Sequence, residues 1–208
     1  MRVMVVGCEY SGVSTLIDGI DRWGLARGIY HHLDDHFTIP DAFHLTEEEQ
    51  AGMLGMLPAI KERFQRFQIV YHVYLMHKFE HVLMGGFYIE EMVYGPRYYY
   101  PGKQIQIREY EVDLPRDTIL VHLHARPEVI RKRMADAPHP HSLVPAGDVE
   151  IVLNQFREEV RASWIPRKFE IDTSDLSPDQ LLQAFLGGSV PHLNATDGNT
   201  RLLTESEI

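Results

Sequence analysis

The sequence predicts an α/β fold in which a doubly wound parallel sheet of about five strands carries helices on both faces. Short apolar runs alternate along the chain with segments of helical periodicity, the pattern of parallel strands joined by crossover helices. The first apolar run ends in a glycine-rich turn that leads directly into a helix, at residues 7–15. These two observations decide the fold class.

The first third of the chain supplies two strands and two helices. Val3–Val6 is an apolar run stopped by glycine, typical of a buried parallel strand. A helix is expected over residues 14–27, which place apolar side chains on one face. A second strand is expected at 29–33, and Thr46–Glu49 forms a capping box that starts another helix.

The middle of the chain is dominated by one long helix. Beyond Pro58, the stretch to Glu80 contains neither glycine nor proline, and its apolar residues recur at helical spacing. Such a helix could support a homodimer face or belong to the core. A third strand interrupted by Gly85-Gly86 follows at 81–87, then a helix at 88–94 and an aromatic loop at 98–102.

The last third repeats the alternation. Strands are expected at 118–123 and 169–171, and helices at 127–134, 149–164 and 178–185. Residues 135–148 carry three prolines and one glycine, which predicts an exposed loop. We therefore expect one domain over residues 1–186 and a polar tail over 187–208.

Composition excludes several classes of partner. The 208 residues include 20 basic and 30 acidic side chains, a net charge of −10 with histidine neutral. That balance argues against a non-specific nucleic-acid or anionic-membrane surface, but a small phosphorylated ligand needs only a few donors. Cys8 is the only cysteine and the first apolar run is too short for a signal peptide or a membrane span, so we expect a cytoplasmic protein.

The turn at residues 7–15 has the frame G-x-x-x-x-G-x-S of a phosphate-binding loop, or P-loop. Such a loop aims backbone N–H groups at a phosphate, with help from the helix dipole. By position, ATP phosphates would meet the backbone of the loop, and Ser14 would hold Mg²⁺. The residues assigned to cofactor binding in the loop are Gly7, Ser11, Gly12, Val13, Ser14 and Thr15. A glycine-rich strand-to-helix turn without nucleotide is the alternative.

Val13 stands where such loops carry a lysine. That lysine would reach the β- and γ-phosphates and offset charge during transfer. Its loss means that another residue supplies the charge, or that phosphoryl transfer is slow or absent.

Four segments resemble the thymidylate kinase and deoxynucleoside kinase group of P-loop kinases, over about residues 1–186. The first is the loop, with Glu9 at its third position, where family members often place an acid that faces the acceptor sugar. The others are 82–94, 123–134 and 169–178, similar to the family's Asp-Arg-Tyr strand, its Pro-Glu-Val helix before the lid, and its closing strand. The resemblance implies ATP and Mg²⁺, a nucleoside or nucleotide acceptor, a lid at 135–148 and Arg133 near the base.

The departures from the family are as informative as the matches. Gly85 and Gly86 replace the Asp-Arg pair, which removes a metal-directed carboxylate and a phosphate-binding guanidinium. The lid segment contains no Lys or Arg. Together with Val13, these losses suggest altered chemistry or a different acceptor.

Arg97 and Asp35 are candidates for compensation. Arg97 follows the helix at 88–94, where the family binds its acceptor, and could grip a phosphate bidentately or simply stack on a neighbouring tyrosine. Asp34 and Asp35 end the second strand, where a carboxylate could accept the proton of an attacking hydroxyl or bind Mg²⁺ through water. Paired acids at a helix start would look similar.

Other polar residues are weaker candidates for a role in the site. Glu90 and Glu91 are adjacent on a helix, so at most one points inward, and a solvated helix start would explain both. Arg126 begins a helix on the ligand side of the sheet or is a solvent-facing charge. His31, His32 and His36, together with Asp34 and Asp35, resemble a metal cluster in composition, but strand alternation would send His31 and His32 to opposite faces. His139 and His141 in the lid segment could supply pH-dependent positive charge, although exposed loop histidines are common.

Two functional hypotheses follow. In the first, the chain is an ATP-dependent kinase in which Glu9, Asp35 and Arg97 face a nucleoside, nucleotide or similar small acceptor. In the second, it is a non-catalytic relative that keeps the fold to bind a nucleotide or a protein partner.

Overall fold

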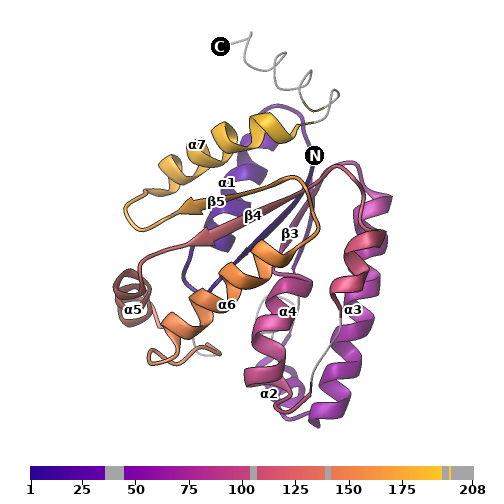
Figure 1. Cartoon of the computed structure of the whole chain (residues 1–208), viewed down its shortest axis with the longest axis vertical. Helices are drawn as coiled ribbons and strands as arrows, with labels where there is room; N and C mark the ends of the chain where they lie inside the picture. The colour runs from indigo at the N-terminus through magenta and orange to yellow at the C-terminus, as the bar shows by residue number, and fades with distance from the viewer. Residues whose placement is uncertain (36–44, 104–106, 139–141, 194–196, 198–208) are drawn as a thin grey trace.

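The computed structural model describes residues 1–35, 45–103, 107–138, 142–193 and 197. It contains a five-stranded sheet in the order β2-β3-β1-β4-β5, with every neighbouring pair parallel (Figure 1). The strands are β1 (Arg2–Gly7), β2 (His32–Asp35), β3 (Val82–Gly85), β4 (Thr118–His124) and β5 (Lys168–Asp172). The predicted parallel α/β fold is confirmed.

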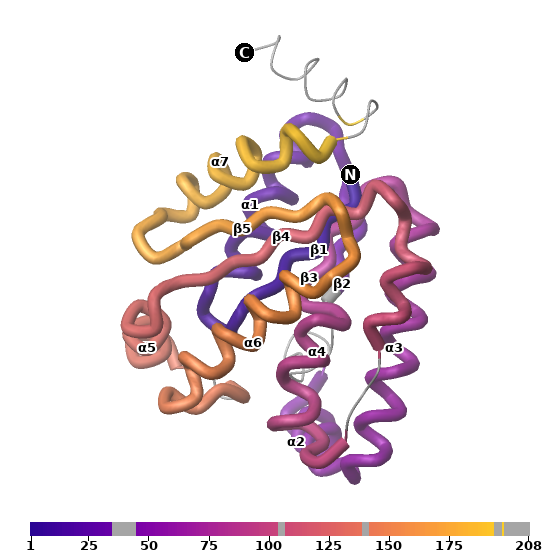
Figure 2. The backbone as a smooth tube through the Cα atoms, viewed as in Figure 1, coloured from indigo at the N-terminus to yellow at the C-terminus, as the bar shows by residue number. Residues whose placement is uncertain are grey.

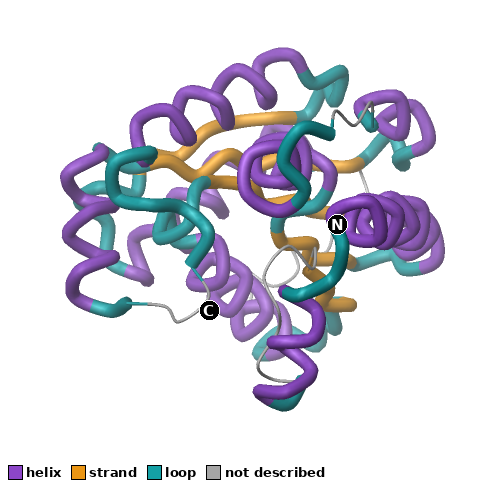
Figure 3. Tube along the Cα trace, turned by 90° about the horizontal axis from the view of Figure 1, so that it is seen from below, coloured by secondary structure: helices purple, strands orange, loops and turns teal. Residues whose placement is uncertain are grey.

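Helices connect the strands and cover both faces of the sheet (Figures 2 and 3). The α-helices are α1 (Val13–Leu25), α2 (Glu47–Leu54), α3 (Pro58–Lys78), α4 (Tyr88–Tyr94), α5 (Pro127–Asp136), α6 (Val149–Ala162) and α7 (Pro178–Ser189). A π-helical turn η1 (Gly95–Tyr99) and the 3₁₀ turns η2 (Arg108–Asp113) and η3 (Val190–His192) complete the described structure.

The sheet divides the core into two clusters because its side chains alternate between faces. Met4 and Val6 of β1 pack toward α3, α4, α5 and α6, in a cluster that includes Phe156. Val3 and Val5 of the same strand pack toward α1 and α7. Buried on both faces, β1 reads as an unbroken apolar run, as the sequence predicts for a central parallel strand.

Element boundaries differ from the sequence prediction at two places that matter. The second strand begins at His32 rather than residue 29, because the chain first closes α1 through a turn in which the Ile29 N–H donates to the Gly24 carbonyl. Gly28, at a φ of 72°, supplies the left-handed residue of that turn. At the other end α7 continues past residue 186 to Ser189, and Asp197 pairs with the Met1 ammonium at 2.8 Å.

Candidate functional site

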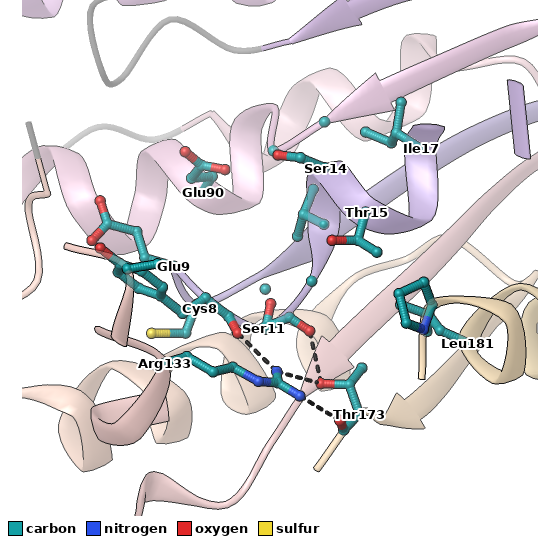
Figure 4. A pocket seen from close by; sticks show the side chains of 18 of the residues that line it. Cys8, Glu9, Ser11, Ser14, Thr15, Ile17, Glu90, Arg133, Thr173 and Leu181 are labelled. Atoms are coloured by element: carbon teal, nitrogen blue, oxygen red, sulfur yellow. Dashed lines mark hydrogen bonds between the residues drawn. The ribbon is translucent and has the colours of Figure 1, made fainter. Parts of the chain in front are cut away.

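A cavity of about 710 Å³ lies beside the carboxyl ends of β1 and β3, within the size range of small-molecule pockets. The P-loop, residues 7–15, forms one wall (Figure 4). The remaining lining residues come from α1, the end of β3 and the turn after it, α4, α5 and the residues just after it, the turn after β5, and the start of α7: Ile17, Gly85, Gly86, Glu90, Tyr94, Arg133, Ala137, Pro138, Thr173, Leu176, Pro178 and Leu181. The glycine-rich loop therefore opens onto a ligand-sized space.

The backbone of the loop has the geometry of an anion-binding concavity. Tyr10 and Gly12 have positive φ angles of 66° and 104°, and Ser11 between them does not. Such alternation turns successive N–H groups toward one point. α1 begins at Val13, and its N-cap, Gly12, contributes no side-chain cap. The first N–H groups of α1 have no partner within the helix, so they add donors and a positive dipole end.

Close packing fixes the start of the loop. A Cβ on Gly7 would lie 2.4 Å from the Leu123 carbonyl oxygen and 2.4 Å from the Ser11 Oγ, so no larger residue fits. Thr173 anchors the other side, since its hydroxyl donates to the Ser11 carbonyl at 2.7 Å. The Ser11 hydroxyl is fully buried and has no hydrogen-bond partner in the described structure.

Val13, Ser14 and Thr15 form the first turn of α1 and line the cavity. Val13 brings an aliphatic side chain where a lysine would bring a charge. The side chains of Ser14 and Thr15 are exposed, so the Ser14 hydroxyl can reach a ligand without rearrangement.

Glu9 is bound to the lid segment rather than directed at open space. Its carboxylate accepts hydrogen bonds from the Ser142 hydroxyl at 2.5 Å, the Leu143 N–H at 2.9 Å and the Val144 N–H at 3.3 Å. The Glu9 N–H donates to the Tyr94 hydroxyl at 2.8 Å. The P-loop is thereby tied to both the lid and α4, a role that the resemblance did not imply.

Arg133 bridges the P-loop and the turn after β5 (Figure 4). Its guanidinium donates to the Tyr10 carbonyl at 2.9 Å, the Thr173 hydroxyl at 3.2 Å and the Thr173 carbonyl at 2.7 Å. The resemblance implies that Arg133 lies near the nucleotide base. The structure places it in the cavity lining with these three bonds already made.

Arg133→Met should lower the free energy of unfolding by about 2 kcal/mol, because charge-assisted bonds to two backbone carbonyls are lost from a half-buried site. Urea unfolding of the variant measures this loss. The matched control is Arg131→Met on the same helix, whose exposed guanidinium bonds the Ala146 carbonyl and Glu150. Equal losses in the two variants would contradict an anchoring role for Arg133.

Fixed positive charge is scarce in the cavity. Among the described lining residues, Arg133 is the only Lys or Arg, and it is engaged as above. A phosphate here would meet backbone N–H groups, the α1 dipole and any metal ion that it carries. Within the described lining, this arrangement is suited to binding phosphate and offers no unengaged Lys or Arg to stabilise transfer.

Arg97, the second predicted catalytic residue, is not among the described residues that line this cavity. Arg97 lies in η1, where it stacks near the Tyr98 ring and approaches the Asp148 carboxylate at 3.9 Å. Asp35 lies at the carboxyl end of β2, opposite Gly85 of β3, and its side chain is outside the described structure. Of the predicted catalytic residues whose side chains the structure describes, Glu9 reaches the lining and Arg97 does not.

The remaining candidates have structural partners. Arg126 holds Asp175 bidentately at 2.8 Å, which raises the pKa of the guanidinium further. Asp34 lies between His32 and the buried His72, at 3.8 and 3.6 Å. Within the described residues no cluster of three or more His, Cys, Asp or Glu side chains could hold a metal ion, and His36, His139 and His141 lie outside them.

Cys8 lines the cavity without being reactive. Burial, with the negative charge of Glu9 as a second cause, raises the pKa of the thiol to about 12. The thiol therefore stays protonated at neutral pH and is a poor nucleophile.

Sequence reasoning missed two contributors to the site, Tyr94 and Thr173, and left a third, Glu90, undecided. Tyr94 and Thr173 reach the loop through contacts between residues far apart in sequence, for which the sequence holds no local signal. For Glu90 the sequence does hold a local signal, since Glu90 lies four residues after Gly86, on the helix that follows β3.

The parallel sheet, the glycine-rich loop and the cavity at the strand ends are features of the P-loop kinase fold. No protein-family profile matches the sequence, and no curated protein matches it. Solved structures do match. YorR protein from Bacillus subtilis, solved with phosphorylated GDP, has a TM-score of 0.61 at 16% identity, with 93% of this chain and 99% of that chain covered.

Two further structures are similar over nearly their whole length. Deoxyadenosine kinase from M. mycoides with bound dATP has a TM-score of 0.60 at 11% identity, covering 90% of this chain and 98% of that one. Thymidylate kinase from Candida albicans has a TM-score of 0.62 at 14% identity, covering 92% and 93%. The chain thus has the P-loop kinase fold. None of the helices in the described residues combines the length and apolar character needed to cross a bilayer.

Proposed function

We propose that this chain binds ATP with Mg²⁺ in the P-loop cavity and transfers phosphate slowly to a nucleoside, a nucleoside monophosphate or a similar small acceptor in the cytoplasm. The observation that carries the proposal is the concave backbone of residues 10–12, set against the uncapped start of α1. The solved structures of this fold named above include two kinases, one of them with bound dATP.

The residues present fit a magnesium–nucleotide complex. The exposed Ser14 hydroxyl is a hard oxygen donor, and the nucleotide phosphates would provide further oxygen ligands of the kind that Mg²⁺ takes. The ion would supply positive charge that the loop itself lacks. The backbone N–H groups would hold the phosphates in place, and Arg133 would keep the loop in its conformation.

Calorimetric titration with ATP and ADP, in Mg²⁺ and in EDTA, tests binding. An ATP-consumption assay over a panel of deoxynucleosides and their monophosphates tests transfer. We expect binding that Mg²⁺ strengthens and turnover well below the about 1–100 s⁻¹ of typical kinases. Absence of nucleotide binding would refute the proposal.

A second candidate function is nucleotide binding without transfer. It is favoured by one observation: in the described lining the only arginine is engaged by the loop and by Thr173. Tight binding with no ATP consumption across the whole panel would select this candidate over the first.

We also propose that two copies of the chain associate through α3. Its inner face is buried, with Ile69 and Met76 in the core, while its outer face is apolar and exposed. The exposed members of this outer stripe are Leu57, Ile60, Phe64, Phe67, Val70, Tyr71 and Tyr74. All but Val70 follow the alternating spacing of three and four residues that pairs helices along a seam.

The size of the stripe suits a two-fold contact between copies. With ordinary side-chain areas, the exposed fractions amount to roughly 700–800 Å², close to the ~800 Å² that each partner buries in a standard interface. A single helix on each copy can pair with itself about a two-fold axis. A second copy is therefore the partner that the stripe fits.

Phe67→Lys should convert the protein from dimer to monomer, because Phe67 is 70% exposed at the centre of the stripe and a buried lysine there would be unpaired. Light scattering after gel filtration gives the mass. Ile151→Lys, on the exposed side of α6, is the control and should remain dimeric. A monomeric wild-type protein at micromolar concentration would overturn this assignment.

A further inference from the structure

The turn that follows β3 is strained and tightly held. Gly86 and Phe87 have consecutive positive φ angles of 73° and 75°, an uncommon conformation for a bulky residue such as Phe87. The Gly86 N–H donates to the Val5 carbonyl at 2.9 Å, which pins the turn beside β1. Phe87 is fully buried and is the N-cap of α4. The first turn of α4 is thereby fixed next to the end of β3.

The carboxylate of Glu90 fills the space above Gly86. A Cβ at position 86 would lie 2.2 Å from the Glu90 Oε2 and 2.8 Å from its Cδ, so a side chain there would displace the carboxylate. Gly86, Glu90 and Ser14 all line the cavity, and Figure 4 shows the side chains of Glu90 and Ser14 there. The glycine at 86 thus makes room for a carboxylate that comes from α4.

A P-loop site needs a carboxylate in this region. P-loop NTPases hold Mg²⁺ between the loop Ser or Thr and an aspartate, and β3 ends in glycines that supply none. Among the described lining residues the acids are Glu9 and Glu90. Glu90 is the better placed of the two, because it lies in the first turn of α4, directly after the end of β3, and its carboxylate lies over Gly86.

We propose that Glu90 is the magnesium-directed carboxylate of this site and acts with the Ser14 hydroxyl on the ion carried by the nucleotide phosphates. The inference rests on the proposed function, since it needs a bound nucleotide. In this site the carboxylate comes from the first turn of α4 rather than from the end of β3, and Gly86 leaves space for it because it has no side chain. Burial raises the pKa values of Cys8 and Tyr94, and the negative charge of Glu90 adds to both increases, consistent with its position beside the loop.

Glu90→Gln tests the proposal, because it keeps the shape above Gly86 and removes only the charge. Calorimetric titration with ATP in Mg²⁺ and in EDTA gives the factor by which Mg²⁺ strengthens binding. We expect this factor to fall at least tenfold in the variant, while affinity in EDTA stays the same or rises because a negative charge no longer faces the phosphates. Mn²⁺ in place of Mg²⁺, followed by electron paramagnetic resonance with ATP present, should show the same loss of metal affinity.

Two further variants distinguish an effect of the Glu90 charge on Mg²⁺ binding from a general effect of substitution. Glu90→Asp retains the charge and should keep part of the Mg²⁺ effect. Glu47→Gln removes an exposed glutamate from the first turn of α2 and should change nothing. If wild-type protein binds ATP with a Mg²⁺ effect that Glu90→Gln preserves, the role of Glu90 is refuted and the proposed function stands. If wild-type protein binds no nucleotide, both fail.

Discussion

Val13→Lys should tighten the binding of ATP by about ten- to a hundredfold, equivalent to about 1.4–2.8 kcal/mol. Val13 is the first residue of α1 and lines the cavity, where a lysine ammonium would reach the β- and γ-phosphates. The described lining offers no competing cation apart from the engaged Arg133. The lysine should also lower the free energy of unfolding by roughly 0.3–1 kcal/mol, because a positive charge at a helix N-terminus is unfavourable, and this cost is smaller than the expected gain in binding.

Calorimetry with ATP, ADP and adenosine distinguishes this effect from a general one. The gain should be largest for ATP and absent for adenosine, which carries no phosphate. Val13→Met is the control, since it adds length without charge and should leave all three affinities nearly unchanged. Unchanged ATP affinity in Val13→Lys would show that the loop does not receive phosphates, and so would count against the proposed function itself.

The parts of this fold that were predictable are those set by local sequence. β1 and β4 are continuous apolar runs, and the capping box at Thr46 and Glu49 forms as expected, with both of its hydrogen bonds. The loop frame at residues 7–15 lies between a strand and a helix, as its spacing required. β2 was placed three residues early, because the turn that closes α1 uses residues that the apolar pattern assigned to the strand.

The chemistry of the site was less predictable because it depends on contacts between distant residues. Glu9 accepts hydrogen bonds from residues 142–144, and Arg133 donates to Tyr10 and Thr173. The Glu9–Leu143 and Arg133–Tyr10 contacts join residues that are 134 and 123 positions apart in the sequence. Neither pairing leaves a periodic or spacing signal in the chain. Gly86 and Glu90 are different, since a glycine four residues before a glutamate is local, but only the backbone angles show that the two share one space.

His122 should make the protein sensitive to mild acid. The ring is fully buried on β4, stacks on Phe156 of α6 and has no hydrogen-bond partner for either nitrogen in the described structure. Burial lowers its pKa to about 4, against opposing attraction from Glu170 of β5, while His124 and Arg157 also disfavour the charged ring. Protonation of His122 is therefore less favourable in the folded state than in the unfolded state.

Proton linkage gives the sign and the size of this change in folding stability with pH. With the folded pKa below the unfolded value of 6.5, stability is fully present above about pH 6.5 and is lost as the pH falls toward 4. A shift from 6.5 to about 4, at about 1.36 kcal/mol per unit, corresponds to a total of about 3 kcal/mol, of which about 2 kcal/mol is lost by pH 5. Burial also lowers the pKa values of His31 and His81, which act in the same direction.

His122→Phe isolates the contribution of this one ring, because His31 and His81 remain in the variant. Urea unfolding at pH 7.5, 6 and 5 should show wild-type protein losing about 2 kcal/mol more than the variant over that range. The phenylalanine also suits the apolar contact with Phe156, so the variant should fold. Parallel stability curves would mean that His122 protonates in the folded state, and an NMR titration of its ring would then show a pKa near 6.5 instead of no shift above pH 5.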